Sequence, residues 1–152
     1  MAVVESVKPV RSAWSHPCRS TASGRHGYRI DSCDPALLAY LHSCLAFSRR
    51  ESLRVIYCDQ WRHYLFDEVF SDGATGGLVG RVRPLFERAL ALGAGGLLLA
   101  HNHPSGNCRP SAADIRSTAL LRDLGAALEV ELIDHLIFAR GRCFSMAGGG
   151  YL

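Results

Sequence analysis

The feature that most constrains the fold is a short apolar run that ends in two histidines. Residues 95–103 read GGLLLAHNH, with glycines before the apolar side chains and the turn-forming sequence PSG directly after them. A run of this length between turn residues is typical of a strand that is covered on both faces. We therefore expect this strand at the centre of a sheet that is packed by helices.

The remaining segments alternate between helical and strand patterns. Ser32 or Asp34 is the expected cap of a first helix that starts at Pro35, and Gly93 is the expected end of a second helix. Short runs rich in β-branched and aromatic residues predict strands, the first two of them joined as a hairpin. The expected helices cover about 35–45, 82–90 and 111–125, and the expected strands cover 53–58, 63–70, 95–103, 129–139 and 143–146.

Composition narrows the class of protein. We expect a flexible arm over residues 1–30 and one domain over residues 31–152. No apolar run approaches the roughly 20 residues of a membrane helix, and no secretory pattern opens the chain, so the sequence predicts a cytoplasmic protein without membrane association. The net charge is +3, and the basic residues form no stripe along the sequence, so the charge does not argue for nucleic-acid binding. The six cysteines include no C-x-x-C pair, which argues against a zinc ribbon.

The residues around the central strand predict a metal centre. His101 and His103 lie two apart, so both imidazoles point to one face of the strand. The loop that follows reverses the chain, and Asp114 arrives in the first turn of the next helix. Two histidines and one carboxylate leave a fourth tetrahedral position open, as in catalytic zinc sites. Glu51, just before a neighbouring strand, is the candidate general base, and Ser111 Oγ is a candidate hydrogen-bond donor to an oxyanion.

Each part of this pattern also has an ordinary explanation. Ser111 and Asp114 fit a capping box, in which the serine caps a helix and the acid occupies its third position. The two histidines fit a solvated strand end, and Glu51 fits an acid that happens to precede a strand. The ordered combination of all these residues is much harder to obtain by accident, and it favours the metal centre.

The same residues carry a resemblance to a known family. His101-x-His103, Ser111 and Asp114 resemble the JAMM (JAB/MPN-plus) metalloprotease motif, and the wording HNHPSG, followed by Thr118 and DHLI, looks like its RadC branch. The resemblance implies an α/β fold with a mixed, curved β-sheet packed by helices, the JAB/MPN (cytidine-deaminase-like) architecture. It also implies zinc (Zn²⁺) at the two histidines and Asp114, with Glu51 as acid and base; Glu68 is the fallback.

The expected function is that of a zinc metallopeptidase-type hydrolase that acts on a peptide or isopeptide bond of a peptide or protein substrate. The alternative is a RadC-like DNA-repair accessory or nucleic-acid-associated protein, although residues 1–30 are too short for the helix-hairpin-helix region that RadC proteins generally carry. The string HNH does not indicate an HNH nuclease, in which these residues are not contiguous. An inert interaction module ranks last, because the ligand set is complete. The oligomeric state stays open.

Two further positions stay open in the sequence. Asp134-His135 fits a hydrogen bond beside the metal face, and it fits equally well a polar pair at a sheet edge or a satisfied core histidine. Cys108 fits a reactive thiol or an adventitious ligand, but an ordinary loop residue is the favoured interpretation.

Overall fold

One mixed sheet organises the molecule, for which a computed structural model describes residues 3–4, 27–45, 48–70 and 81–152. Six strands follow one another across the sheet in the order β1-β6-β5-β4-β2-β3. The strands are β1 (Val3–Val4), β2 (Leu53–Cys58), β3 (Tyr64–Phe70), β4 (Gly96–Asn102), β5 (Glu131–Ala139) and β6 (Arg142–Ser145). The helices are α1 (Pro35–Leu45), α2 (Val82–Leu92) and α3 (Ala112–Ala127). The predicted mixed α/β fold with helices packed on a sheet is confirmed.

Strand β4 lies inside the sheet because its side chains are buried along its whole length. It pairs antiparallel with β2 and parallel with β5. The parallel pair needs a crossover, and α3 provides it between β4 and β5. Since β4 runs directly into this crossover, its carboxyl end opens into the loop that leads to α3.

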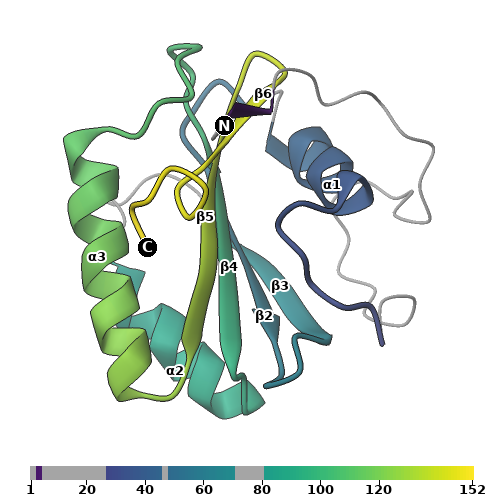
Figure 1. Ribbon diagram of the computed structural model, residues 1–152, viewed down its shortest axis with the longest axis vertical. Helices are drawn as coiled ribbons and strands as arrows, with labels where there is room; N and C mark the ends of the chain where they lie inside the picture. Colours follow the sequence, from purple (N-terminus) through teal and green to yellow (C-terminus); the bar gives the residue numbers. More distant parts are fainter. Residues whose placement is uncertain (1–2, 5–26, 46–47, 71–80) are drawn as a thin grey trace.

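Helices cover both faces of the sheet, so two apolar cores form (Figure 1). Leu98 and Ala100 of β4 face α1, where they pack with Leu41. Leu97 and Leu99 face the other way and join the core that includes Phe86 of α2 and Leu121 of α3. The strand alternation that separates these two cores also decides which residues at the end of β4 reach the α3 side.

A buried polar cluster lies between α1 and the edge strand β3. The guanidinium of Arg54 pairs with the carboxylate of Asp67, and both side chains are buried. Tyr40 and Tyr64 donate their hydroxyl protons to the same carboxylate. The charge of Arg54 is thus compensated inside the core, which is the condition for burying it without a large penalty.

The helix ends follow the local sequence. The carboxylate of Asp34 accepts a hydrogen bond from the backbone N–H of Ala36 at 2.8 Å, so the predicted cap of α1 is confirmed. Gly93 ends α2 in a left-handed conformation with φ 62°. Helix α3 continues past the predicted end at Gly125 to Ala127. Gly125 instead allows a close backbone approach, since a Cβ there would lie 2.4 Å from the carbonyl oxygen of Val130.

The predicted arm over residues 1–30 lies mostly outside the described residues. Its described ends contact the domain: Val3–Val4 pairs with β6, and Ile30 is buried against α1. Strand β1 is too short for a sequence pattern to reveal it. No helix in the described part of the chain is long and apolar enough to cross a membrane.

Candidate metal centre

The carboxyl end of β4 brings two histidines and one glutamate to the same side of the sheet. His101 pairs with Leu53 of β2. On the other side of β4, the backbone N–H of His103 donates to the carbonyl oxygen of Phe138 in β5 at 2.8 Å. Glu51 precedes Leu53 by two residues, so strand alternation places its side chain on the face that carries the histidines. This is the face that α3 covers.

Asp114 reaches the same point from the first turn of α3. The helix starts with a complete capping box, in which Asp114 N–H donates to Ser111 Oγ at 3.1 Å and Ser111 N–H donates to Asp114 Oδ2 at 2.7 Å. The box fixes the carboxylate against the helix start, where the other oxygen faces His101 Nε2 at 3.4 Å. The capping box and the metal ligand, which the sequence presented as alternatives, are therefore compatible.

The four side chains form one compact cluster, here called the metal centre: Glu51, His101, His103 and Asp114. One ligand atom from each lies within 4.8 Å of the others. Asp114 is 3.4 Å from His101 Nε2 and 3.3 Å from His103 Nε2, and Glu51 Oε1 is 3.6 Å from His101 Nε2. No other group of three or more such residues occurs in the described part of the chain.

These distances fit a tetrahedral zinc ion with a small adjustment. Ligand atoms about 2.0–2.1 Å from a tetrahedral zinc lie about 3.3 Å from one another. The carboxylate–imidazole distances of 3.4 and 3.3 Å are close to this separation, but they involve different oxygens of Asp114, Oδ1 for His101 and Oδ2 for His103. The carboxylate therefore has to turn to present one oxygen to a shared ion. The two Nε2 atoms are 2.8 Å apart. One ring has to turn by roughly 0.5 Å to admit the ion at tetrahedral spacing. His103, which lies in the loop and is the less buried of the two, has the freedom to do so.

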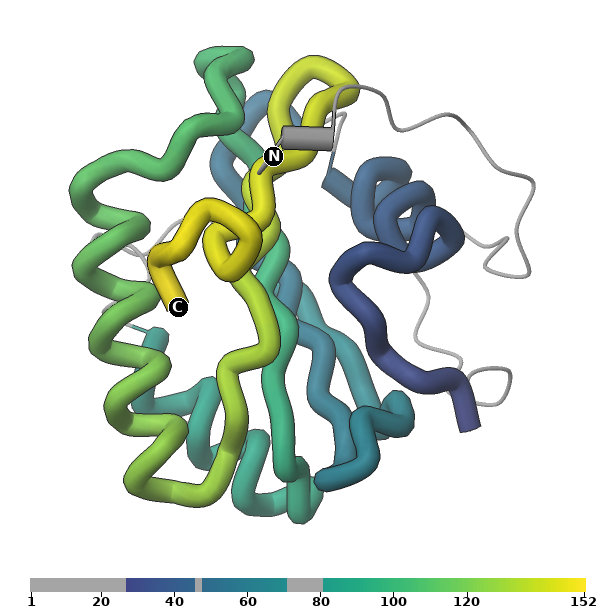
Figure 2. The backbone as a smooth tube through the Cα atoms, in the orientation of Figure 1, coloured from purple at the N-terminus to yellow at the C-terminus, as the bar shows by residue number. Residues whose placement is uncertain are grey.

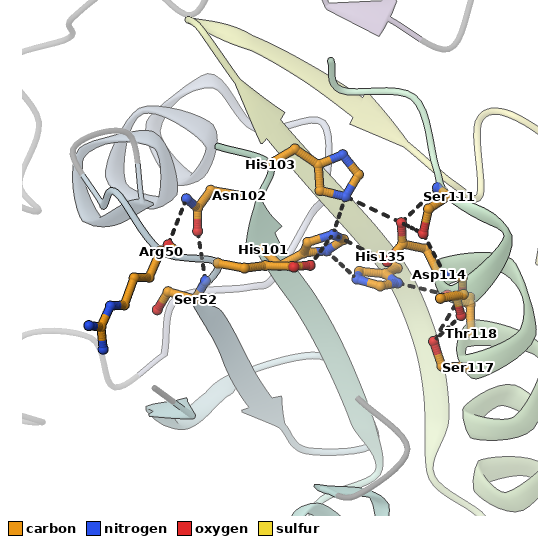
Figure 3. A network of polar contacts seen from close by, with 12 residues as sticks. Arg50, Ser52, His101, Asn102, His103, Ser111, Asp114, Ser117, Thr118 and His135 are labelled. Carbon is orange, nitrogen blue, oxygen red and sulfur yellow. Dashed lines mark hydrogen bonds and ion pairs between the residues drawn. The ribbon is translucent and has the colours of Figure 1, made fainter. Parts of the chain in front are cut away.

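Both histidines are held so that Nε2 faces the centre. His103 Nδ1 lies 2.7 Å from the carbonyl oxygen of Asn107, which accepts only if Nδ1 carries the proton. His101 Nδ1 lies 2.8 Å from His135 Nε2, and His135 Nδ1 lies 2.7 Å from Thr118 Oγ1 (Figure 3). If His101 binds a metal through Nε2, its Nδ1–H donates to His135, which in turn donates to Thr118. This chain orients the ligand as hydrogen-bonded partners do in metal sites.

The protonation states of His101 and Asp114 suit metal ligands, whereas the hydrogen bond with Asp114 raises the pKa of His103. Burial and the neighbouring His135 lower the pKa of His101 well below its ordinary value. Burial also lowers the pKa of His135 to about 4. Burial alone would raise the pKa of Asp114, but the hydrogen bonds with His103 and Ser111 outweigh it and lower this pKa. The centre thus presents an ionised carboxylate beside a neutral, buried imidazole, which are the forms that bind metal.

Asn102, between the two histidines, is a part of the site that the sequence reasoning missed. It points to the opposite face, where its Oδ1 accepts from Ser52 N–H at 2.8 Å (Figure 3). Its Nδ2 donates to the carbonyl oxygens of Ser48 and Arg50 at 3.2 and 3.1 Å. These bonds hold the segment on both sides of Glu51. The available signal was an amide in a strand predicted to be buried on both faces, since such a group needs partners.

Three other residues singled out in the sequence are Ser111, Glu68 and Cys108, and none of them is a member of the metal centre. Ser111 Oγ donates to Asp114 Oδ2 at 2.6 Å, so its role toward an oxyanion stays a prediction. Glu68, on the edge strand β3, accepts a hydrogen bond from Tyr57 and does not join the centre. Cys108 is buried in a small apolar cluster.

The Asp134-His135 pair divides between two tasks. His135 Nε2 lies 2.8 Å from Nδ1 of the candidate ligand His101, which is the hydrogen bond beside the candidate metal centre that the sequence left open. Asp134 instead accepts from Ser145 Oγ at 2.6 Å and from Ala147 N–H at 3.0 Å. The histidine therefore belongs to the site, and the aspartate fastens the chain after β6.

Comparison with known proteins places these features in a family. A sequence model described as RadC-like JAB domain matches residues 32–151. A UPF0758 protein of Rhodobacter capsulatus is 36% identical over 151 residues, which cover 99% of this chain and 69% of that protein. A UPF0758 protein of Ruegeria pomeroyi is 34% identical over 151 residues, which cover 99% of this chain and 66% of that protein. One of Burkholderia mallei is 37% identical over 113 residues, which cover 74% of this chain and 41% of that protein. The chain thus matches only part of each relative.

Proposed function

The chain belongs to the family of RadC-like JAB domains, and we propose that it is a zinc-dependent hydrolase that cleaves a peptide or isopeptide amide bond. One observation carries the proposal. The proposed three-ligand set consists of His101, His103 and Asp114. Glu51 lies within 4.8 Å of these ligand atoms and is not needed to complete the set. A base beside an incomplete coordination shell is the arrangement that hydrolysis of an amide by water requires.

The donor set favours zinc over harder cations. Imidazole nitrogen suits zinc and other transition metals, whereas magnesium and calcium prefer a shell of oxygen atoms. Here two of the three proposed ligands, His101 and His103, are imidazoles, and Asp114 adds one carboxylate. When bound, zinc supplies Lewis-acid catalysis and makes water available as a nucleophile near neutral pH.

Glu51 is the residue that moves the proton in this proposal. Its side chain is 57% exposed, so water and a substrate can reach the carboxylate. As the oxygen of water forms its bond to the carbonyl carbon, Glu51 accepts a proton from that water. It then returns the proton to the amide nitrogen while the carbon–nitrogen bond breaks, which leaves a free amine and a carboxylic acid.

Ser111 can contribute only by redirecting its single hydroxyl proton. That proton points to Asp114 Oδ2 in the capping box. If it turns toward an oxyanion, the backbone N–H of Ser111 still donates to the same carboxylate oxygen at 2.7 Å. The ligand Asp114 therefore stays oriented while the hydroxyl acts as a donor to the reacting carbonyl oxygen.

A Glu51→Gln variant tests the proposal. Loss of the base should lower turnover of quenched peptide or isopeptide substrates by about 100-fold or more, because general-base catalysis typically contributes at least that factor. Zinc content should stay near one equivalent, since this substitution removes none of the three proposed ligands. The matched control is Glu87→Gln on the exposed surface of α2, which should keep full turnover. Equal turnover in the Glu51 variant and its parent would show that the base is assigned wrongly.

A further inference from the structure

A second opening lies beside the metal centre, toward α1. It is a pocket of about 340 Å³ at the carboxyl end of β4, between the end of α1 and the turn that joins β5 to β6. The loop after β4 and that turn rise at the same end of the molecule (Figure 2). His103 lines this pocket and also belongs to the metal centre. A substrate held in the pocket is therefore adjacent to the reacting site.

The lining of the pocket combines an apolar floor with a cationic rim. Leu45, Phe138 and Ala139 are buried and form the apolar part. Arg49 and Arg140 are exposed on the rim. None of the described residues that line the pocket is acidic, and neither arginine forms an ion pair with a described acid. The two charges are available to a ligand.

The backbone at Arg140 gives a second, independent observation. A two-residue turn joins β5 to β6, with φ 47° at Arg140 and φ 76° at Gly141. Asparagine and glycine are the residues that favour such a turn, so an arginine here carries a conformational cost. The guanidinium also lies against Gly106 of the ligand loop, where a Cβ would be 2.2 Å from Arg140 Nε. The turn thus places the Arg140 guanidinium at the pocket, although the local backbone conformation disfavours an arginine at this position.

Burial lowers the pKa of His42, another residue of the pocket, so that its ring is mostly neutral at neutral pH. Arg49 and Arg140 therefore supply the permanent positive charge of the pocket. Its volume is at the lower end of the roughly 300–1,000 Å³ typical of small-ligand sites, which suits one amino-acid residue. A nucleic-acid strand would instead need many phosphate contacts along an extended basic surface.

From these observations we propose that the pocket is a substrate subsite for a carboxylate next to the scissile amide. The carboxylate pairs with Arg49 and Arg140, and the aliphatic part of the same residue lies against Pro104, above the buried apolar floor. It can come from an acidic side chain or from the C-terminus of the peptide. This inference rests on the proposed hydrolase function, since it specifies the substrate of that site.

Peptide binding to a variant that does not cleave provides the test. Four labelled pools of octapeptides, random except at one central position, carry either Glu or Gln there and end in either a carboxylate or an amide. Their affinities for the full chain with Glu51→Gln are measured by fluorescence anisotropy. We expect one carboxylate-bearing pool to bind about fivefold more tightly than the pool with central Gln and an amide end. This is the gain expected of a partly exposed ion pair. A preference for central Glu assigns a side-chain carboxylate, and a preference for the free end assigns the C-terminus.

The variant Arg140→Asn distinguishes a loss of carboxylate binding from a loss of folding. Asparagine favours the turn, so this substitution should keep or raise thermal stability while it abolishes the carboxylate preference. Arg49→Gln should weaken the preference by itself, and Arg83→Gln on the surface of α2 should leave it unchanged.

Three outcomes would overturn the subsite. They are equal binding of all four pools, a preference that survives both pocket substitutions, or arginine-dependent binding of single-stranded DNA that is tighter than that of every peptide pool. The pools do not report on hydrolysis, so a failed subsite leaves the effect of Glu51→Gln on turnover as a separate result. Conversely, a carboxylate preference without any turnover supports the pocket and contradicts the hydrolase.

Discussion

Replacing Asn102 by alanine should loosen the segment that carries Glu51. The amide is buried, with 4% of its surface exposed. It accepts one hydrogen bond from Ser52 N–H and donates two, to the carbonyl oxygens of Ser48 and Arg50. All three partners belong to the segment before β2, so one substitution removes all three hydrogen bonds that Asn102 makes to this segment.

The magnitude follows from the number of bonds and from their exposure. A hydrogen bond in a folded protein contributes roughly 0.5–1.5 kcal/mol, so three bonds set an upper range of about 1.5–4.5 kcal/mol. Arg50 and Glu51 are exposed, and water can therefore reach the freed backbone groups and offset part of the loss. We expect Asn102→Ala to lower the free energy of unfolding by about 2 kcal/mol.

Urea unfolding of the metal-free protein, followed by far-ultraviolet circular dichroism, measures this loss. The matched control is Asn107→Ala in the exposed ligand loop, whose side chain accepts a single bond from Arg109 N–H at 3.1 Å. It should cost less than about 1 kcal/mol. Zinc content should persist in the Asn102 variant, because this substitution removes none of the three proposed ligands. A loss no larger than that of the control would refute the role assigned to Asn102.

Three further outcomes are expected. His135→Phe removes the hydrogen-bond acceptor of the proposed ligand His101 and should weaken zinc binding about 10–100-fold in a competition with a chelating dye, as the loss of such partners does in metal sites. Unchanged affinity would contradict the orienting role of His135. Asp67→Asn leaves the buried charge of Arg54 uncompensated and should lower the free energy of unfolding by about 3–5 kcal/mol; a loss below about 1 kcal/mol in urea would contradict it. Burial raises the pKa of the Cys58 thiol to about 12, so at pH 8 iodoacetamide should label exposed Cys33 long before Cys58, as peptide mass spectrometry can show; equal labelling would show that β2 opens readily.

Much of the fold was accessible from the sequence, because its signals are local. The apolar run of β4 and the cap at Asp34 depend on residues a few positions apart. The candidate ligands were accessible for the same reason: strand alternation puts His101 and His103 on one face, and a short loop returns Asp114. Their gathering with Glu51 is observed in the structure, whereas their roles remain predictions.

The parts that were missed depend on contacts between distant segments. The bond between Asn102 and Ser52 spans 50 positions of the chain, and the bond between Thr118 and His135 joins a helix to a strand. The rim of the pocket is a similar case. Arg49 stands in a short basic pair too small to predict a binding surface, and only the register of the sheet brings Arg140 to it.

Zinc stoichiometry of the purified protein, with His101→Ala in parallel, is the most direct test of the metal centre. The geometry predicts one zinc per parent chain and retention that depends on His101, since this imidazole is within 3.6 Å of each of the other three side chains. The variant should hold less than about one tenth of an equivalent in the presence of a chelator, because loss of one ligand leaves an incomplete set. Less than about half an equivalent in the parent, or equal zinc in parent and variant, would contradict the metal centre.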